Sequence, residues 1–392
     1  MANYELIERT LSEGKQLLEQ LKTSVRIRGQ ELSLYNAGLK EGEKRFGLFT
    51  RDLLLSAFIL GDDKLLRETV KFACLTQGKE KDARTGEEPG KVIHEYEHVK
   101  LRGRETRFNA CDTTPLALLA FGELFDRGFS DFVIKRKNHV NGALNYLFKH
   151  IKDGIFWEDP ALCGADRFAL RSTYWKDDRL PGREHPDYPV AYSLVQAQTV
   201  AGLRAAERLA SQMDLNYDQS ELRETADAIL FSLLTNLWDE ERGFPAIAKD
   251  ERGLITGISS DGLHTLFYLE PGDLPTGKLE SIASTAELLN TPYGYRTYAQ
   301  DQTDYADDSY HLGSLWPFEQ FFIARGAKQF GYPLLAEKAS RALVALDKFG
   351  FYELFGWNGR ELRPLGCDRQ LWSACLPVGI KRIFAVDREN TD

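Results

Sequence analysis

The sequence predicts an all-α protein whose helices pair into hairpins and form an inner and an outer ring. Helical periodicity recurs along the whole chain, whereas alternation of apolar and polar residues never lasts beyond a few positions. Tight turns alternate with long irregular connections, as expected when each hairpin gives one helix to each ring. The long connections would then gather at one end and carry the functional residues.

The individual elements follow from leucine spacing and from helix-start and helix-stop signals. The first segment, 4–23, is amphipathic, and 33–45 is rich in turn residues. Asp112 is expected to cap the next long helix, with Pro115 in its first turn. About twelve helices are expected in all: 4–23, 53–60, 64–77, 112–127, 131–150, 188–212, 219–238, 262–269, 279–288, 319–329, 334–348 and 371–385.

Composition predicts one soluble globular domain that spans residues 1–392. The chain contains 43% hydrophobic and 28% charged residues and has no low-complexity linker. A net charge of −9 argues against nucleic acid or an anionic membrane as a partner, because both require a basic face. No leader pattern and no apolar run of ~18 to 20 residues is present. Five cysteines without paired spacing are expected to be reduced thiols, and we expect a cytoplasmic protein.

The central irregular segment, 172–183, combines the residue types that a sugar site needs. It reads Ser-Thr-Tyr-Trp-Lys-Asp-Asp-Arg-Leu-Pro-Gly-Arg, so that Trp175 lies close to Asp177 and Asp178. Aromatic rings stack on the C–H faces of a sugar, and a carboxylic acid protonates the departing glycosidic oxygen. Taken alone, the segment fits a charged surface loop with a buried Trp equally well.

Further acidic and aromatic residues stand at the ends of the other long connections. Each one alone is weak evidence, because an Asp at a helix start is usually a cap and a Trp is usually in the core. Their recurrence at successive connections is a stronger signal for a shared site. These groups are Arg51-Asp52, Asp112, 307–311 with Trp316, 351–353 with Trp357, and 366–372.

A competing motif is His94-Glu95-Tyr96-Glu97-His98, which satisfies the zinc-peptidase pattern H-E-x-x-H. That chemistry requires a helix, since the two imidazoles must lie one turn apart to bind the metal. The flanking Gly and Pro residues favour a strand or a loop instead. We therefore expect no metal and no cofactor, and a zinc peptidase remains the second class of function.

Six short motifs together resemble the α-1,6-glucosidase domain of glycogen debranching enzymes and, more distantly, the glucoamylase and processing-glucosidase families. The motifs are Phe49-Thr-Arg-Asp52, Pro89-Gly-Lys-Val-Ile-His-Glu95, Asp112-Thr-Thr-Pro115, Trp175-Lys-Asp177, Tyr310-His-Leu-Gly-Ser-Leu-Trp-Pro317 and Gly366-Cys-Asp-Arg-Gln-Leu-Trp-Ser373. The resemblance implies an (α/α)6 barrel and inverting glycoside hydrolysis of an α-linked glucoside or a related small glycoside or oligosaccharide.

By the same resemblance, Asp177 is the general acid and Glu353 is the general base. The expected substrate-binding residues are Arg51, Asp52, Asp112, Trp175, Asp178, Arg179, His311, Trp316, Gln370 and Trp372. The partner is a carbohydrate substrate. A third class of function, a sugar-binding or isomerising barrel without hydrolysis, would keep the aromatic residues without needing both acids.

The chain departs from the family pattern at Lys176 and Asp178, where relatives commonly have Met and Ala. The second carboxylate leaves the acid open between Asp177 and Asp178. Two adjacent carboxylates in an aromatic pocket should repel, which would raise the pKa of one of them; we expect that one to be Asp177. The chain also lacks room for the additional domains of debranching enzymes, which favours a small glycoside over glycogen.

Overall fold

The computed structural model describes residues 4–39, 46–96, 99–101 and 103–389. Within these ranges the chain forms fourteen α-helices, three 3-10 helices and nine small antiparallel sheets. The α-helices are α1 (Tyr4–Leu21), α2 (Thr50–Leu60), α3 (Asp63–Thr76), α4 (Thr113–Asp126), α5 (Ser130–Ile134), α6 (Lys137–His150), α7 (Ser193–Ala210), α8 (Gln219–Thr235), α9 (Asp261–His264), α10 (Thr276–Thr285), α11 (Pro317–Gln329), α12 (Pro333–Ser340), α13 (Ala342–Phe349) and α14 (Leu371–Glu389).

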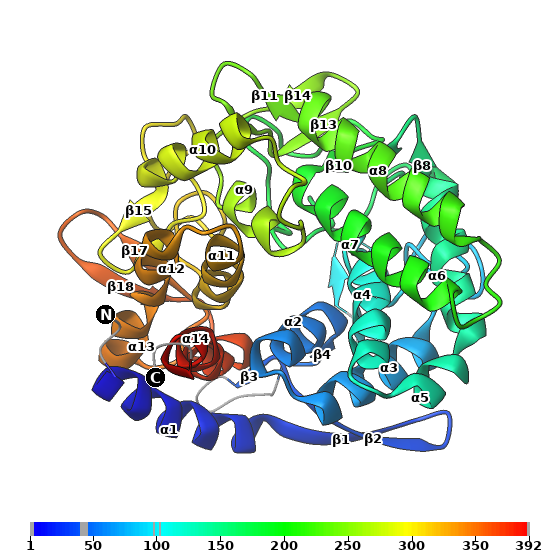
Figure 1. Ribbon diagram of the computed structural model, residues 1–392, viewed down its shortest axis with the longest axis horizontal. Helices are drawn as coiled ribbons and strands as arrows, with labels where there is room; N and C mark the ends of the chain where they lie inside the picture. Colours follow the sequence, from blue (N-terminus) through cyan, green and yellow to red (C-terminus); the bar gives the residue numbers. More distant parts are fainter. Residues whose placement is uncertain (1–3, 40–45, 97–98, 102, 390–392) are drawn as a thin grey trace.

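The helices form two concentric rings, as the view down the ring shows (Figure 1). In the inner ring α2, α4, α7, α9, α11 and α14 each contact the next helix, and α14 closes the ring on α2. The outer helices α1, α3, α6, α8, α10 and α12 cover it (Figure 1). The predicted (α/α)6 barrel is confirmed by this arrangement.

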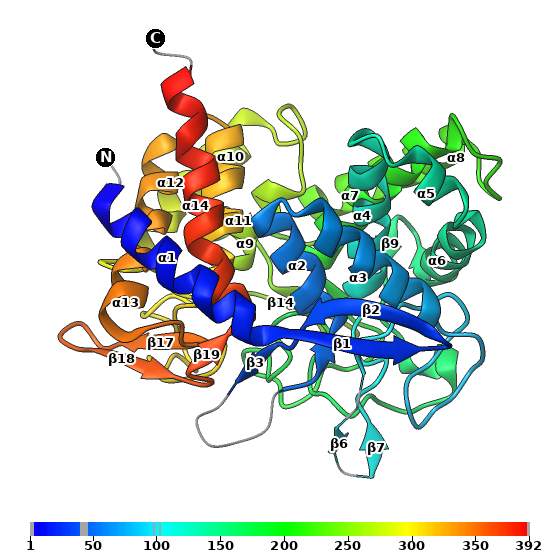
Figure 2. The ribbon, with the colours of Figure 1, turned by 90° about the horizontal axis from the view of Figure 1, so that it is seen from below.

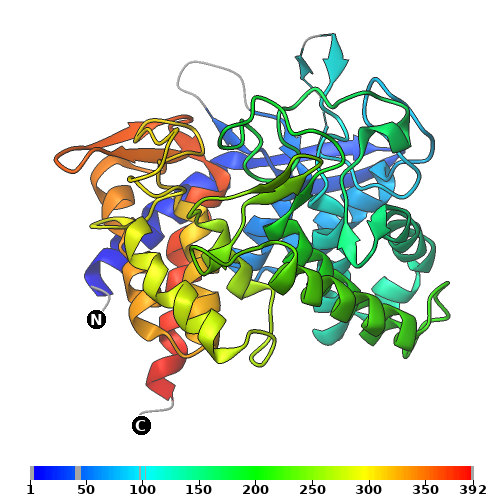
Figure 3. The same ribbon diagram turned by 90° about the horizontal axis from the view of Figure 1, so that it is seen from above.

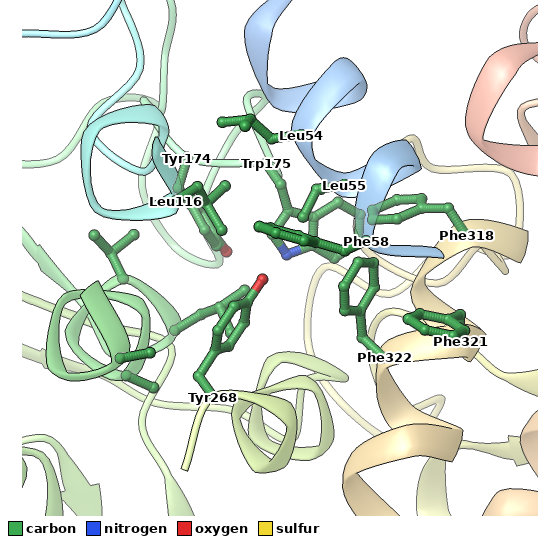
Figure 4. Close-up of a cluster of buried hydrophobic side chains, with 14 of the residues drawn as sticks. Leu54, Leu55, Phe58, Leu116, Tyr174, Trp175, Tyr268, Phe318, Phe321 and Phe322 are labelled. Atoms are coloured by element: carbon green, nitrogen blue, oxygen red, sulfur yellow. The ribbon is translucent and has the colours of Figure 1, made fainter. Parts of the chain in front are cut away.

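The inner helices are buried on nearly every side, whereas an outer helix such as α1 keeps an exposed face. Ten of the eleven residues of α2 are buried, and α7 is buried along almost its whole length. A helix that is apolar all round is the kind that belongs inside such a ring. The centre is filled by side chains: Leu54, Phe58, Trp175, Phe318 and Phe322 meet there (Figure 4).

The strands are short, and most of them lie within the connections between helices. They are β1 (Lys22–Ile27), β2 (Gln30–Tyr35), β3 (Gly38–Leu39), β4 (Leu48–Phe49), β5 (Glu95–Tyr96), β6 (Lys100–Leu101), β7 (Arg104–Glu105), β8 (Ile151–Lys152), β9 (Ile155–Phe156), β10 (Ala191–Tyr192), β11 (Trp238–Asp239), β12 (Phe244–Pro245), β13 (Ala248–Asp250), β14 (Gly253–Ile255), β15 (Asn290–Thr291), β16 (Gly294–Tyr295), β17 (Leu354–Trp357), β18 (Leu362–Leu365) and β19 (Arg369–Gln370). The sheet β10-β13-β14 has three strands, and every other sheet is a pair. The 3-10 helices are η1 (Pro160–Cys163), η2 (Thr265–Phe267) and η3 (Ala286–Leu289).

Long connections and strands gather at one end of the barrel (Figures 2 and 3). In Figure 2, β3, β6, β7, β17, β18 and β19 lie at that end, and most of the helices extend toward the other end. Functional residues predicted from the sequence stand where inner helices begin: Arg51 and Asp52 in the first turn of α2, Asp112 before α4, and Trp316 before α11. The first turns of α2, α4 and α11 therefore lie at the end of the barrel where the long connections gather (Figure 2).

Two of the predicted helices are each divided in the structure, which accounts for the difference from about twelve. Residues 131–150 fall into α5 and α6, and residues 334–348 into α12 and α13. The chain leaves helical geometry at Arg136, whose φ is −111° and whose guanidinium stacks on the ring of Phe132. The break at Arg341 is slight, because its backbone stays in the right-handed helical region.

The largest departure from the sequence prediction is the β1–β2 hairpin, because the helix predicted over 4–23 ends at Leu21, and residues 33–35 of the predicted turn-rich stretch belong to a strand. The strands pair from Lys22 with Tyr35 to Ile27 with Gln30. Arg28 and Gly29 both have positive φ, of 48° and 79°, as a two-residue hairpin turn requires. Alternating burial in β1 and β2 is the period-2 signal that the prediction overlooked.

The start of one later helix, the cysteines and the absence of a membrane span in the described residues agree more closely with the sequence prediction. The helix predicted from residue 188 begins only at Ser193, because Ala191 and Tyr192 pair with β13. All five cysteines are buried and unpaired. None of the helices in the described part of the chain combines the length and hydropathy that a membrane span requires.

Candidate active site

A cavity of about 330 Å³ opens at the end of the barrel where the long connections gather. Its deep wall carries charged and aromatic side chains that are nearly inaccessible to solvent, and its mouth carries exposed apolar ones. The lining residues are Ala37, Phe46, Phe49, Arg51, Asp52, His94, Glu95, Val99, Leu101, Thr106, Leu170, Trp175, Asp177, Tyr310, Trp316, Glu353, Cys367, Gln370 and Trp372.

Arg51 is held in this cavity by a buried ion pair with Asp112. Its Nε lies 2.7 Å from Asp112 Oδ2, and its Nη2 lies 3.0 Å from Asp112 Oδ1. The remaining nitrogen, Nη1, lies 3.7 Å from Asp177 Oδ2. Burial works to lower the pKa of Arg51, but the two aspartates raise it above its ordinary value. The guanidinium is thus a fixed positive charge next to Asp177.

Asp112 does not cap α4, contrary to the expectation from the sequence. It occupies the position before the helix, but its side chain makes no capping hydrogen bond. Its carboxylate is engaged by Arg51 instead, and it does not line the cavity. Asp112 therefore acts on the cavity through the orientation that it gives to Arg51.

Asp177 lies between Arg51 and His311 with about 29% of its side chain exposed. His311 Nε2 is 3.5 Å from Asp177 Oδ1, so both neighbours lie beyond normal hydrogen-bond length. Burial works to raise the pKa of Asp177, but His311 and Arg51 outweigh it and hold that pKa below its ordinary value. The expected increase caused by Asp178 is therefore wrong for the free protein.

Glu353 is fixed by two hydrogen-bond donors immediately before β17. The Tyr310 hydroxyl donates to Oε1 at 2.7 Å, and the Cys367 backbone N–H donates to Oε2 at 3.0 Å. Burial raises the pKa of Glu353 above its ordinary value, although the two donors work to lower it and the charge of Asp177 raises it further. Glu353 and Asp177 are thus near enough to influence each other.

Two more carboxyl groups line the cavity and have pKa values near neutrality. Burial raises the pKa of Asp52 to about 8, opposed by Arg51 and assisted by Glu353 and Asp177. Burial likewise raises the pKa of Glu95 to about 7. Glu95 Oε1 accepts hydrogen bonds from the Val99 backbone N–H at 2.9 Å and from the Thr106 hydroxyl. The cavity therefore contains a set of interacting acids together with one guanidinium.

Aromatic rings form the deep wall beside these acids. Trp175 packs edge-on against Trp316 at a centroid distance of 5.7 Å, and Trp372 stacks on Phe318 at 4.1 Å. His311 stacks on Trp316 at 4.9 Å. This packing fixes the rings as rigid apolar surfaces, as stacking on a sugar requires.

A buried aspartate that sequence reasoning missed, Asp261, holds the segment before Asp177. The Tyr174 hydroxyl and the Trp175 indole donate to it at 3.0 and 2.8 Å, and Lys176 Nζ lies 3.3 Å from Oδ2. Lys176 also donates to the hydroxyl of Ser259 at 2.6 Å. Asp261 begins the short helix α9 and looks like an ordinary helix-start residue in the sequence, so no pattern distinguishes it.

Two predicted binding residues, Asp178 and Arg179, do not line the cavity. Asp178 pairs with Arg171 at 3.1 Å, and Arg179 lies 3.6 Å from Asp304. Asp178 and Arg179 are thus held in two separate ion pairs outside the cavity. His311 also lies behind the cavity wall, where it contacts Asp177, whereas Gln370 lies on the lining.

The H-E-x-x-H segment is not helical where the structure describes it. Glu95 and Tyr96 form β5, which pairs with β4, while His98 lies outside the described residues. Burial and the nearby Arg51 lower the pKa of His94 to about 3, so its imidazole is neutral. Among the described residues no three His, Cys, Asp or Glu side chains are grouped so as to hold a metal ion.

Sequence reasoning also missed several lining residues at the mouth. Phe46, Val99 and Leu170 sit in irregular segments and Leu101 in the two-residue strand β6, where an isolated apolar residue carries no periodic signal. Tyr310, the hydrogen-bond partner of Glu353, lies within one of the recognised motifs but had no role assigned.

Comparison with known proteins decides the class of enzyme. The model of the mannosylglycerate hydrolase MGH1-like glycoside hydrolase domain matches residues 159–358. The chain belongs to this family of glycoside hydrolases. The predicted enzyme class, an inverting O-glycosyl hydrolase, is therefore confirmed. The matched region contains Asp177 and Glu353. The matched model describes a mannosylglycerate hydrolase-like domain and not a debranching enzyme, so the resemblance to the debranching domain is supported only at the level of the glycoside hydrolase class.

Solved structures of other proteins show the same fold as this glycosidase. The GH63 mannosylglycerate hydrolase from Thermus thermophilus in complex with glucose has 16% sequence identity and a TM-score of 0.66, with coverage of 94% of this chain and 99% of that chain. The same hydrolase in complex with Tris and D-glycerate gives a TM-score of 0.67 with the same identity and coverage. No curated protein matches the chain by sequence.

Proposed function

We propose that this glycosidase hydrolyses an α-linked glucoside or a related small glycoside, with Asp177 as general acid and Glu353 as general base. The observation that carries the proposal is the presence of both carboxyl groups on one cavity with aromatic walls. Inversion needs an acid at the departing oxygen and a base that activates water on the opposite face of the sugar.

The hydrogen bonds of Glu353 suit a base. Both of its oxygens accept from fixed donors, Tyr310 and the Cys367 backbone, and such bonds favour the ionised carboxylate. Each oxygen keeps a lone pair with which to take a proton from water. Neither Arg51 nor His311 places a donor within normal hydrogen-bond length of Asp177, so its oxygens are available to a ligand in the cavity.

The proton for the acid comes from the coupled set of carboxyl groups. With a pKa of about 8, Asp52 is protonated at neutral pH, and it interacts with Asp177 and Glu353. In such a set the proton belongs to the group of acids and not to one member. A sugar that enters the cavity displaces water from Asp177, which favours the neutral, proton-donating form of that residue.

The remaining lining residues would bind the sugar. Trp175, Trp316 and Trp372 offer apolar faces to the ring, and Asp52 and Gln370 offer polar atoms to its hydroxyl groups. Arg51 keeps Asp177 in place, and Asp112 and His311 support that arrangement from behind the wall.

The size of the cavity favours a small glycoside over a branched polymer. A volume of about 330 Å³ lies at the low end of small-molecule sites. One sugar unit with a modest leaving group fits that space better than a glycogen branch. The likeness to a mannosylglycerate hydrolase adds α-mannosides to the α-glucosides as the sugars to examine first.

A panel of α-glucosides and α-mannosides tests the proposal through release of free sugar, with proton NMR to follow the anomer. The wild-type protein should first release the anomer of opposite configuration. The variants Asp177→Asn and Glu353→Gln should each lose most turnover, while Asp178→Asn, outside the cavity, serves as the matched control. Sugar binding without turnover by the wild type would instead support a non-hydrolytic barrel, and loss of activity with a chelator would support a metalloenzyme.

A further inference from the structure

Exposed apolar side chains line the mouth of the cavity, although charged and polar side chains line its deep part. Phe46, Val99 and Leu101 line the cavity with 44%, 49% and 39% of their surface exposed, and half-buried Leu170 joins them. The deep residues Arg51 and Trp175 are by contrast only 2% exposed. Exposed apolar side chains grouped at one site mark a binding surface.

Backbone and side-chain hydrogen bonds fix these residues in place. The Phe46 backbone N–H donates to Gly38 O at 3.0 Å. Val99 is held through its N–H to Glu95, and its carbonyl accepts from the Thr106 N–H at 3.1 Å. The hairpin of β6 and β7, which carries Leu101, projects from this end of the barrel (Figures 2 and 3).

Three members of this apolar group, Val99, Leu101 and Leu170, lie on the side of Asp177, whereas Phe46 is bonded to Gly38, which pairs with Gln370. Glu95, which anchors Val99, interacts electrostatically with Asp177 and Arg51. The Leu170 N–H donates to Asn109 Oδ1 at 3.2 Å, and the Cys111 N–H donates to Thr173 O at 2.7 Å, so the chain that follows Val99 and Leu101 runs beside the segment that leads to Asp177. The leaving group of a glycosidase departs next to the acid that protonates it.

The charges of the described lining residues disfavour an anionic leaving group. Asp52, Glu95, Asp177 and Glu353 are acids, and Arg51 is the one Lys or Arg side chain among the described lining residues. Arg51 is already engaged by Asp112 and Asp177. Asp52 is protonated at neutral pH and the general acid carries its proton, so a carboxylate on the leaving group would be repelled by Glu353 and by the ionised fraction of Glu95.

We propose that the enzyme prefers glycosides with an apolar leaving group, such as an aryl-alkyl or alkyl alcohol, over those of glycerate or glycerol. The inference rests on the proposed assignment of Asp177 as the acid. Phe46, Val99, Leu101 and Leu170 determine this specificity by covering the apolar group as it enters the cavity. The expected substrate class therefore differs from what the name of the solved mannosylglycerate hydrolase describes.

The test compares three leaving groups on each sugar: the 2-phenylethyl, glyceryl and glycerate α-D-mannosides and α-D-glucosides. All three are alkyl alcohols, so the chemical step is similar and the comparison reports mainly on binding. The 2-phenylethyl glycoside should have a kcat/KM at least about tenfold above the other two. Equal or faster cleavage of the glycerate or glyceryl glycoside would overturn the inference and leave the proposed function intact.

A double variant tests whether the apolar side chains at the mouth, and not a general loss of activity, determine the preference for the leaving group. Phe46→Ser with Leu101→Ser should lower kcat/KM for the 2-phenylethyl glycoside at least about fivefold and change the glyceryl glycoside less than about twofold. Phe231→Ser, which removes a 66% exposed phenylalanine on the outer helix α8, is the control. An unchanged ratio of the two substrates in the double variant would contradict the inference.

If none of these glycosides is cleaved, the proposed function fails for both sugars, and calorimetry then tests the mouth directly. The wild-type protein should bind the 2-phenylethyl mannoside more tightly than the glyceryl mannoside, and the double variant should lose that difference. Equal affinities in the wild type would overturn the inference independently of catalysis.

Discussion

Two hydrogen-bond donors hold the Glu353 carboxylate in a fixed orientation, as a general base requires. Tyr310 and the Cys367 backbone both donate to it, yet burial still holds its pKa above the ordinary value. The sequence pointed to Glu353 only through a motif that follows it in the chain. Its hydroxyl partner lies 43 residues away in sequence and could not be paired with it without the fold.

Glu353→Gln should keep the shape of the side chain and lose the ability to accept a proton. We expect kcat to fall by about 10³ or more, because general base catalysis contributes about 10² to 10⁴ and water loses its activation. Substrate affinity, measured by calorimetry, should change by no more than a few fold. Turnover above a tenth of the wild-type value would contradict the role of Glu353 as base.

The acids of the cavity also predict a bell-shaped dependence of kcat/KM on pH. Activity should fall in acid as Glu353 is protonated, at a pH above the ordinary pKa of a glutamate because burial raises its pKa. It should fall in alkali near pH 8, where the coupled set that includes Asp52 loses its proton. Constant activity from neutral pH to pH 10 would show that no such proton is needed.

The prediction for the Asp177–Asp178 pair failed for an instructive reason. Adjacent residues in a chain were expected to share one pocket, but the backbone turns Asp178 toward Arg171 while Asp177 faces Arg51. Because Asp178 is adjacent in sequence, it was expected to set the pKa of Asp177, whereas in the structure burial raises that pKa and His311 and Arg51 together lower it below its ordinary value. The partners that matter for Asp177 come from α2 and from the segment before α11, which only the closed ring brings together.

The segment 174–177 is positioned by α9 through a buried ion pair between Lys176 and Asp261. Lys176 was recognised as a departure from the family pattern, but its partner was not, because short helix α9 lies far along the chain. Asp261 therefore couples the acid-bearing segment to the inner ring. Hairpin β1–β2 was missed in a different way, since its alternation spans only a few residues beside a strong helical signal.

Asp261→Asn should leave the Lys176 ammonium buried without its anion. Loss of one member of a buried pair costs about 3 to 5 kcal/mol, so we expect a decrease of this size in the free energy of unfolding. The value of kcat should fall more than KM rises, because the displaced segment carries Asp177 and not the whole sugar site. Denaturant unfolding and steady-state kinetics measure the two effects.

The double variant Lys176→Met with Asp261→Asn is the matched control for that interpretation. Removing the charge from both partners should recover a large part of the lost stability, because no unpaired buried charge remains. A double variant as unstable as Asp261→Asn alone would show that the loss arises from the hydrogen bonds of Tyr174 and Trp175.

The ring as a whole was predictable because helix periodicity and connection length are both local signals. The alternation of short and long connections indicated two rings, and the twelve predicted segments correspond to the helices or helix pairs of the structure. Convergence of Arg51, Asp177 and Glu353 on one cavity agrees with the prediction that the long connections gather at one end of the barrel. The mouth could not be predicted, because its residues lie in segments without a period.

That residues 1–392 form one folding unit stays a prediction, and the closure of the ring by α14 on α2 supports it. A ring whose first and last inner helices pack together should unfold cooperatively. Far-ultraviolet circular dichroism and tryptophan fluorescence should give coincident denaturant transitions. Two separated transitions would indicate independent units.

The dependence of each variant on the leaving group tests the assignment of acid and base most directly. A 2,4-dinitrophenyl glycoside departs without protonation, whereas a 2-phenylethyl glycoside needs an acid. Asp177→Asn should therefore keep kcat/KM within about tenfold of the wild type on the first and lose about 10³ or more on the second, while Glu353→Gln loses a similar factor on both. The reverse pattern, with Glu353→Gln sensitive to the leaving group and Asp177→Asn insensitive, would contradict the account and exchange the two roles.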